Sequence, residues 1–226
     1  STYLFMLIMV IVTFSYVSSY SRHVGTLTNQ EDIENFSRDF LNSLAYILPM
    51  MYSIFVCSIF ANYSVIMDKA KRNIESLMAT PVSVNQIWIG KSLAVTLPSI
   101  VIGISVSILV YLVMNFGFVI PKTHSFIFPQ AIAVVSAIIL VPILVLGIVS
   151  IVIYVQLIIT NPRIANLVFT AIFILLIFGV NAIGGLGVSI NYFPLIYLGV
   201  IVVCAGVCLI LSRFLTKEKV LLSSKM

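Results

Sequence analysis

Five long stretches of this chain contain no Asp, Glu, Lys or Arg. They cover residues 1–21, 40–67, 92–121, 123–162 and 164–212. A helix needs about 20 predominantly apolar residues to cross a hydrocarbon core of about 30 Å. The last stretch is 49 residues long, so it accommodates two helices and a turn. The pattern therefore predicts an all-α, polytopic membrane protein with six transmembrane helices.

The composition excludes most other classes of protein. Only 8% of the residues are charged, whereas a soluble domain carries roughly 25%. The apolar residues run continuously instead of alternating, which excludes a transmembrane β-barrel. The net charge of +5 does not indicate nucleic-acid binding, because the basic residues flank the apolar stretches. We expect one membrane domain over residues 1–226, with the lipid bilayer and no nucleic acid as a partner.

Charged and helix-breaking segments separate the predicted spans. The spans cover about 3–20, 44–67, 93–115, 126–159, 164–182 and 193–211. Residues 21–43 form a predicted polar loop, and the predicted loop after the third span holds Pro121, Lys122 and His124. Pro129 and Pro142 are expected to break and kink the long fourth span. The glycine-rich stretch 184–194 is interpreted as a re-entrant element.

The distribution of basic residues predicts the orientation. Nine Lys and Arg residues follow spans two, four and six, and three follow spans one and three. Because cytoplasmic loops carry the excess of positive charge, both termini are expected inside, in a multi-pass protein of a prokaryotic cytoplasmic membrane. The first segment has a second interpretation as a signal peptide, since Ser18, Ser19 and Ser21 are small, although no basic region precedes it.

Catalytic signatures are missing from the sequence. No predicted span contains Asp, Glu, Lys, Arg or His, which disfavours a proton relay. No HExxH or GxSxG pattern occurs, and the Walker A pattern is incomplete because Asn85 replaces its first glycine. We expect no catalytic residue, no metal site and no bound cofactor in this chain. Three cysteines are interpreted as small buried hydrophobes, with metal or redox use as the alternative: Cys57, Cys204 and Cys208.

Four amide side chains lie in or near the predicted spans. They are Asn62, Gln156, Asn166 and Asn181. Amides are costly when they face lipid, so they are expected to face protein or a cavity. They are candidates for a substrate path, and hydrogen bonding between helices is the alternative.

The charged stretch 68–91 has its own pattern. Apolar side chains at positions 70, 74, 77 and 78 have the spacing of an amphipathic helix. Pro81 ends this helix, and Ser83 with Gln86 forms a capping box that starts the third span. The stretch therefore predicts a short inside-facing helix, a sharp turn and a new helix entering the bilayer. A basic interfacial helix that binds anionic lipid is the structural alternative.

This stretch resembles the signature of type-2 ATP-binding-cassette exporter permeases. In that family, the loop after the second span follows the pattern E-R-x-x-G-T-L-E-x-L-L-x-T-P-V-S-x-x-E-I-x-x-G-K. The matching positions are Asp68-Lys69, Ile74-Glu75, Leu77-Met78, Thr80-Pro81-Val82-Ser83, Ile87 and Gly90-Lys91. The departures are Arg72-Asn73 in place of Gly-Thr and Gln86 in place of the frequent Glu.

The resemblance implies that residues 68–91 couple this chain to a separate ATPase subunit. It implies that two permease chains, identical or paralogous, assemble with two ATPases, which bind ATP and Mg²⁺. This chain would then be a transport subunit and not an enzyme. The residues expected at the coupling contact are Asp68, Arg72, Glu75, Leu77, Met78, Pro81, Ser83, Gly90 and Lys91. The alternative function is a passive channel or a structural subunit of a membrane complex with a basic interfacial helix.

Overall fold

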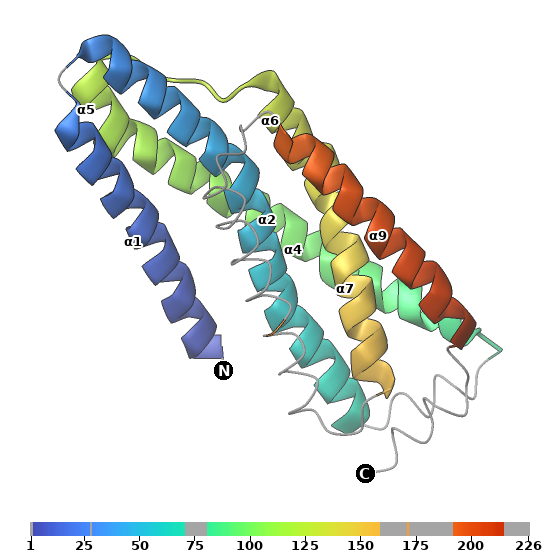
Figure 1. Ribbon diagram of the computed structural model, residues 1–226. Coiled ribbons are helices and arrows are strands. Elements are labelled where there is room, and N and C mark those ends of the chain that lie inside the picture. The colour runs from blue at the N-terminus through green and yellow to red at the C-terminus, as the bar shows by residue number, and fades with distance from the viewer. Residues whose placement is uncertain (1, 28, 71–80, 159–170, 172–191, 215–226) are drawn as a thin grey trace.

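In the computed structural model, the described parts of the uncharged stretches form long helices that run between the two ends of an elongated bundle (Figure 1). The structure describes residues 2–27, 29–70, 81–158, 171 and 192–214. This part is helical and contains no β-strand. Within it, four helical stretches are long and apolar enough to cross a membrane: Gln30–Ala61, Val84–Thr123, Ala131–Ile158 and Phe193–Phe214. The helical fold is thus confirmed for the described residues, the four apolar stretches support a membrane protein, and six spans stay a prediction.

The predicted polar loop over residues 21–43 is wrong. Helix α1 (Thr2–Thr26), which contains the predicted first span, is followed closely by α2 (Gln30–Ala70). The cause is tertiary packing of the polar segment: the Tyr20 hydroxyl is 2.8 Å from the Ser37 hydroxyl, and the Tyr20 ring lies 6.0 Å from the Phe36 ring and 4.9 Å from the Phe40 ring. These apolar contacts offset the polar composition and extend α2 well ahead of the predicted start at residue 44.

The third predicted span, 93–115, is too short. Helix α4 (Val84–Met114), the π-helical turn η1 (Asn115–Val119) and α5 (Ile120–Thr123) form one continuous stretch of 40 residues. At 1.5 Å per residue this stretch is about 60 Å long. Pro121 does not end it, because the preceding π turn lets the Ile120 N–H bond to the Asn115 carbonyl. The prediction that Pro121 and Lys122 lie in a loop is therefore wrong.

The fourth predicted span, 126–159, begins later than expected. His124 adopts a left-handed conformation with φ of 54° and ends α5. A non-helical linker, residues 124–130, then leads to α6 (Ala131–Val135), the π turn η2 (Ser136–Leu140) and α7 (Val141–Ile158). The predicted break at Pro129 is confirmed. Pro142 follows η2 as Pro121 follows η1, because a π turn accommodates the missing proline N–H.

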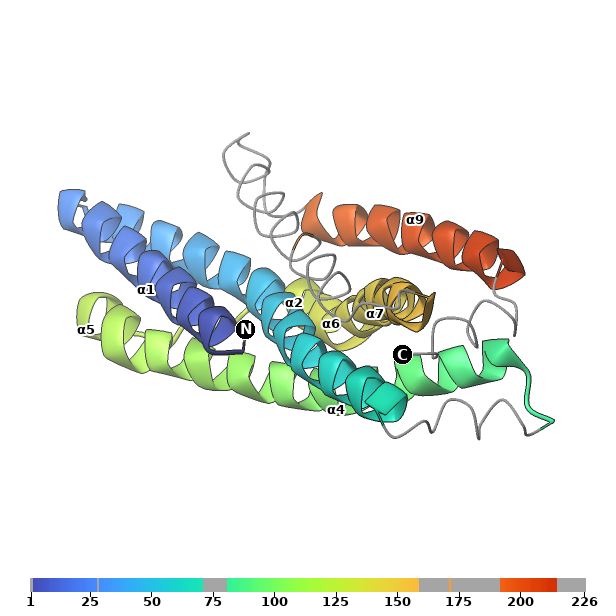
Figure 2. The same cartoon turned by 90° about the horizontal axis from the view of Figure 1, so that it is seen from below.

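Helix α9 (Phe193–Phe214) starts where the last span was predicted and runs three residues further. Figure 2 shows α6 and α7 between α9 on one side and α4 on the other. The Tyr197 hydroxyl donates to the Tyr46 carbonyl at 2.8 Å, which ties α9 to α2. Cys204 packs against Gly147 of α7. The predicted fifth span lies outside the described residues except for residue 171, as does most of the predicted re-entrant stretch.

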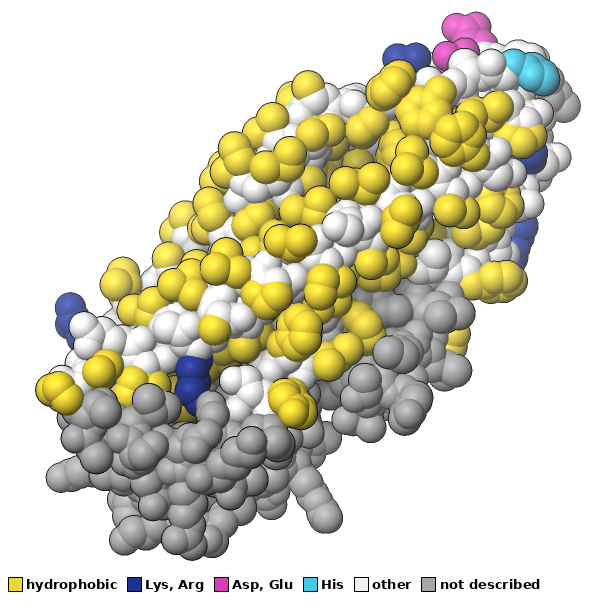
Figure 3. Space-filling view, turned by 180° about the vertical axis from the view of Figure 1, so that it is seen from behind, with side chains coloured by type: hydrophobic (Ala, Val, Ile, Leu, Met, Phe, Trp, Pro, Cys, Tyr) yellow, Lys and Arg dark blue, Asp and Glu magenta, His cyan; other side chains and the backbone are white. Residues whose placement is uncertain are grey.

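The two ends of the bundle differ in charge. One end, here called the acidic end, holds the α1–α2 turn and α5, with Glu31, Asp32, Glu34, Asp39, Arg22, Arg38 and Lys122 (Figure 1). The opposite end holds the end of α2, the start of α4, and the ends of α7 and α9. Between the ends, one side of the molecule is mostly hydrophobic (Figure 3). The loops predicted inside therefore leave from one common end, and the side of the membrane that it faces stays a prediction.

Candidate functional site

Two regions bear on function: the start of α4 at the opposite end, and an apolar groove nearer the acidic end. Of the predicted coupling residues, the structure describes the surroundings of Pro81, Ser83, Gly90 and Lys91. Asp68 lies in the last turn of α2. The remaining predicted coupling residues lie outside the described residues: Arg72, Glu75, Leu77 and Met78. The predicted amphipathic helix therefore stays a prediction.

The capping box at the start of α4 is confirmed. Ser83 has extended backbone angles, φ −74° and ψ 149°. Its hydroxyl accepts the Gln86 backbone N–H at 3.3 Å, and the Gln86 side chain accepts the Ser83 N–H at 3.0 Å. Two N–H groups that a helix start otherwise leaves unpaired are thus satisfied. Such a cap contributes about 1 kcal/mol to the stability of the helix. It fixes the start of α4 at Val84, shortly after the exposed Pro81.

Trp88 is a contact that sequence analysis missed. Its side chain is buried, and its indole N–H donates to the Ser150 carbonyl of α7 at 2.8 Å. The ring also meets the Tyr154 ring edge-on, with centroids 5.9 Å apart. The signal for this contact was available, because Trp88 is the single tryptophan and lies inside the recognised motif. Its effect is to fasten the start of α4 to α7.

The two remaining coupling residues of α4 are Gly90 and Lys91, and neither is buried in the bundle as Trp88 is. Gly90 is exposed, and a side chain added there would meet no atom within 4 Å. Lys91 is half-buried on the next position of α4. Gly90 and Lys91 thus lie close along the helix to the Trp88 contact, while Gly90 faces away from the bundle. An exposed glycine next to a fastened tryptophan leaves one side of α4 open to another molecule.

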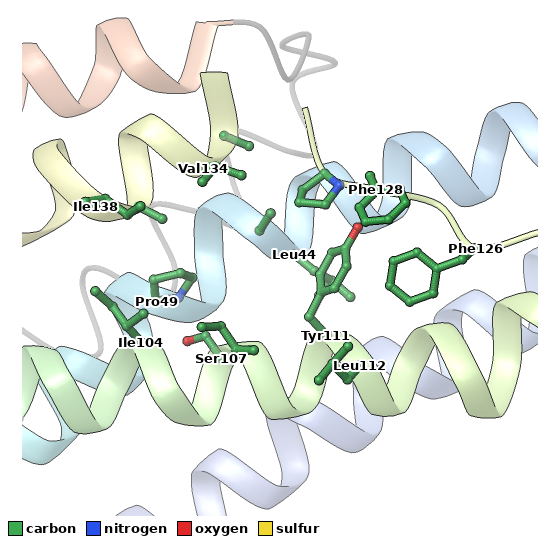
Figure 4. Close-up of a pocket in the computed structure, with 15 residues that line it drawn as sticks. Leu44, Pro49, Ile104, Ser107, Tyr111, Leu112, Phe126, Phe128, Val134 and Ile138 are labelled. Atoms are coloured by element: carbon green, nitrogen blue, oxygen red, sulfur yellow. The ribbon is translucent and has the colours of Figure 1, made fainter. Parts of the chain in front are cut away.

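The groove lies between α2, α4, the linker and α6 with η2. Its volume is about 290 Å³. Figure 4 shows the lining side chains converging from these elements. The lining is apolar except for the hydroxyls of two side chains: the Ser107 hydroxyl donates to the Gly103 carbonyl at 2.6 Å, and the Tyr111 hydroxyl donates to the Ile127 carbonyl at 3.0 Å. The lining residues are Leu44, Ala45, Pro49, Ile104, Ser107, Ile108, Tyr111, Leu112, Phe126, Phe128, Pro129, Ala133, Val134, Ala137 and Ile138.

Two buried asparagines hold the linker over this groove. The Asn115 amide donates to the Ile127 carbonyl at 3.0 Å and accepts the Ile127 N–H at 3.2 Å. The Asn42 side-chain oxygen accepts the Gln130 N–H at 2.9 Å. These bonds satisfy an irregular backbone that would be costly to bury unpaired. Sequence analysis missed both asparagines, although both lie inside uncharged stretches, because their partners are backbone atoms of another segment.

The two predicted substrate-path amides within the described stretches, Asn62 and Gln156, are not among the residues that line the groove. Gln156 is buried in α7, and Asn62 lies in α2. Asn166 and Asn181 lie outside the described residues. The polar groups at the groove are instead Ser107 and Tyr111, which sequence analysis had not selected as site residues.

Comparison with known proteins adds no family assignment. No protein-family model, curated protein or solved structure matches this chain.

Proposed function

We propose that this chain is the membrane-spanning permease subunit of an ATP-driven exporter, and that a separate ATPase subunit binds and hydrolyses ATP. The observation that carries the proposal is the stretch 68–91, which resembles the coupling signature of type-2 ATP-binding-cassette permeases. The capping box of Ser83 and Gln86 lies within this stretch, so α4 begins at Val84 inside the signature. A force applied to residues 68–80 would therefore reach α4 through a short connection.

The geometry of α4 supports a mechanical role. A continuous helical stretch of 40 residues leads from the capping box to the acidic end. Trp88 fastens the beginning of this stretch to α7, and Gly103 brings it close to Ser53 of α2. Closure of two ATPases would tilt α4 and α7 together about the contact with α2, which is a rigid-body transition of packed helices. The result would be a change in the distances between the helices that line the groove.

We propose two permease chains for each transporter, identical or paralogous, with two ATPases that bind ATP and Mg²⁺. The charge-free lining of the groove suits a lipidic, amphiphilic or peptide substrate better than a small ion. Ions need charged or carbonyl ligands that replace their hydration shell, and the groove offers only two hydroxyl groups, both already bonded.

The test is a titration of a candidate ATP-binding-cassette ATPase from the same genome against the purified chain in nanodiscs. Glu75→Gln removes the acidic side chain expected to bind the ATPase. Loss of such a contact should cost about 1.4 kcal/mol or more and lower the affinity at least tenfold. If Glu75 only pairs within its own helix, the effect should be about 0.2–0.5 kcal/mol.

The matched control is Glu34→Gln. Glu34 is an exposed acidic residue at the acidic end and pairs with Arg38 at 3.5 Å. Its replacement should leave the affinity for the ATPase and the stimulation of ATP hydrolysis unchanged. Equal affinity of wild type and Glu75→Gln, together with no stimulated ATP hydrolysis, would refute the exporter and favour a channel or a structural subunit.

A further inference from the structure

We infer that the apolar groove is a binding site for one acyl chain of a membrane phospholipid. The inference rests on the membrane-crossing helices and goes beyond the exporter proposal, which it does not require. Its starting point is position: the α2 residues that line the groove lie five to ten residues past Asp39, the last charged residue before the apolar stretch. This places the groove about 8–15 Å along the helix from the charged segment, where the outer part of an acyl chain lies.

The groove opens toward the surroundings of the bundle. Three lining residues have large exposed fractions: Ile108 with 54%, Phe128 with 78% and Ile138 with 60%. Between them, the floor is formed by α2, where Ala45 and Pro49 contribute to the lining (Figure 4). Because this part of the chain lies in membrane-crossing stretches, the molecules that reach the opening are lipids and not water.

The volume of the groove matches a flexible hydrocarbon chain. Its 290 Å³ is close to twice the volume of an apolar cavity of about 150 Å³ that binds benzene. At about 30 Å³ for a water-sized group, it holds roughly ten methylene groups. A helix of a partner protein has a diameter of about 10–12 Å with its side chains and does not fit. A single acyl chain is therefore the occupant that matches both size and lining.

The polar headgroup of the lipid would lie near the basic side chain of Lys122. The linker leaves α5 next to Lys122, and four residues later Phe126 lines the groove. A phosphate held near Lys122 would lie at the end of the acyl chain that leaves the groove. Phe126 and Phe128 have their ring centroids 4.8 Å apart and line the groove at this boundary. The linker is fixed by the asparagine bonds, so the boundary is preformed.

The test uses the full chain in nanodiscs without any ATPase, with a phosphatidylglycerol that carries a diazirine in its acyl chain. After illumination, mass spectrometry locates the cross-linked residues. We expect Ile108, Leu112 and Ile138 to be labelled at least about threefold more than Val202 and Leu209, the exposed residues of α9, because only a groove adds packing contacts beyond those of bulk lipid. Equal labelling of all exposed faces would overturn the inference.

Two variants and a control make the assignment specific. Ala137→Trp fills the groove and should lower labelling there at least about threefold, while labelling of α9 stays constant. If this variant does not fold, Val134→Trp obstructs the opening from a position that is already 40% exposed. Ala205→Trp, on the exposed side of α9, should leave labelling of the groove unchanged. Labelling that persists in a folded Trp variant of the groove would also overturn the inference. Because no ATPase is present, failure here leaves the exporter proposal untouched.

Discussion

Replacing Gly103 by alanine should force α2 and α4 apart. A Cβ atom at position 103 would lie 2.6 Å from the backbone nitrogen and 2.7 Å from the Cα of Ser53, and it would also meet the Ser53 hydroxyl. Because the backbone of α2 cannot rotate away as a side chain can, the helices must separate. Overpacking of this kind costs about 1–3 kcal/mol. The helix propensity of alanine offsets about 1 kcal/mol of this cost.

A matched control accounts for the higher helix propensity of alanine relative to glycine. Gly206 lies within α9, and a Cβ atom there would meet nothing within 4 Å. Gly206→Ala should therefore be neutral or stabilising by up to about 1 kcal/mol. The difference between the two variants isolates the contact with Ser53, about 1–3 kcal/mol. For a chain of this size, this difference corresponds to about 2–12 °C in the midpoint of thermal unfolding.

The assay is thermal unfolding of the purified chain in nanodiscs, at one scan rate for all variants. Trp88 is the single tryptophan and is buried between α4 and α7, so its fluorescence reports the loss of this contact. The reasoning predicts that Gly103→Ala unfolds at a lower temperature than Gly206→Ala. A midpoint for Gly103→Ala at or above that of Gly206→Ala would refute the close approach of α2 and α4.

Two further substitutions test the contacts that hold the candidate site. Asn115→Leu leaves the buried Ile127 N–H without its acceptor, which should cost about 1–3 kcal/mol. Hydrogen exchange at the Ile127 amide should accelerate about 5- to 150-fold, and an unchanged rate would contradict the role of Asn115. Trp88→Phe removes the donor to the Ser150 carbonyl and should lower stability by about 0.5–1.5 kcal/mol for the bond, plus the smaller packing of the ring. Thermal unfolding followed by circular dichroism measures this loss, and an unchanged midpoint would show that the indole N–H does not stabilise the α4–α7 contact.

The helical boundaries show where sequence reasoning succeeds and where it fails. Ser83 and Pro129 were located correctly, because capping and the loss of a proline N–H act within a few residues. The polar composition of residues 30–43 predicts a loop, and the helix forms there because Phe36 and Phe40 pack against Tyr20. Pro121 was expected to lie outside a helix, because a π turn that accommodates a proline leaves no distinct sequence signal.

The candidate site also contains features that local sequence predicts and features that it does not. The order of residues within 68–91 is enough to predict a turn between two helices, and Ser83 with Gln86 confirms the second of them. The groove could not be predicted, because its walls come from α2, α4 and the continuous segment 126–138, which are separated from one another in sequence. The contact between Trp88 and Ser150 joins residues 62 positions apart, so local pattern gives no indication of it.

The amino-acid sequence alone predicted a helical chain with membrane-crossing stretches, because uncharged stretches of this length can satisfy their backbone in lipid only as helices. It also determined where α4 begins, since a capping box is a local hydrogen-bonding device. The lengths of α2 and α4, their close approach at Gly103 and the groove between them are set only in the folded chain. The physical reason is that these features depend on packing between side chains far apart in the sequence, and that packing overrides local composition.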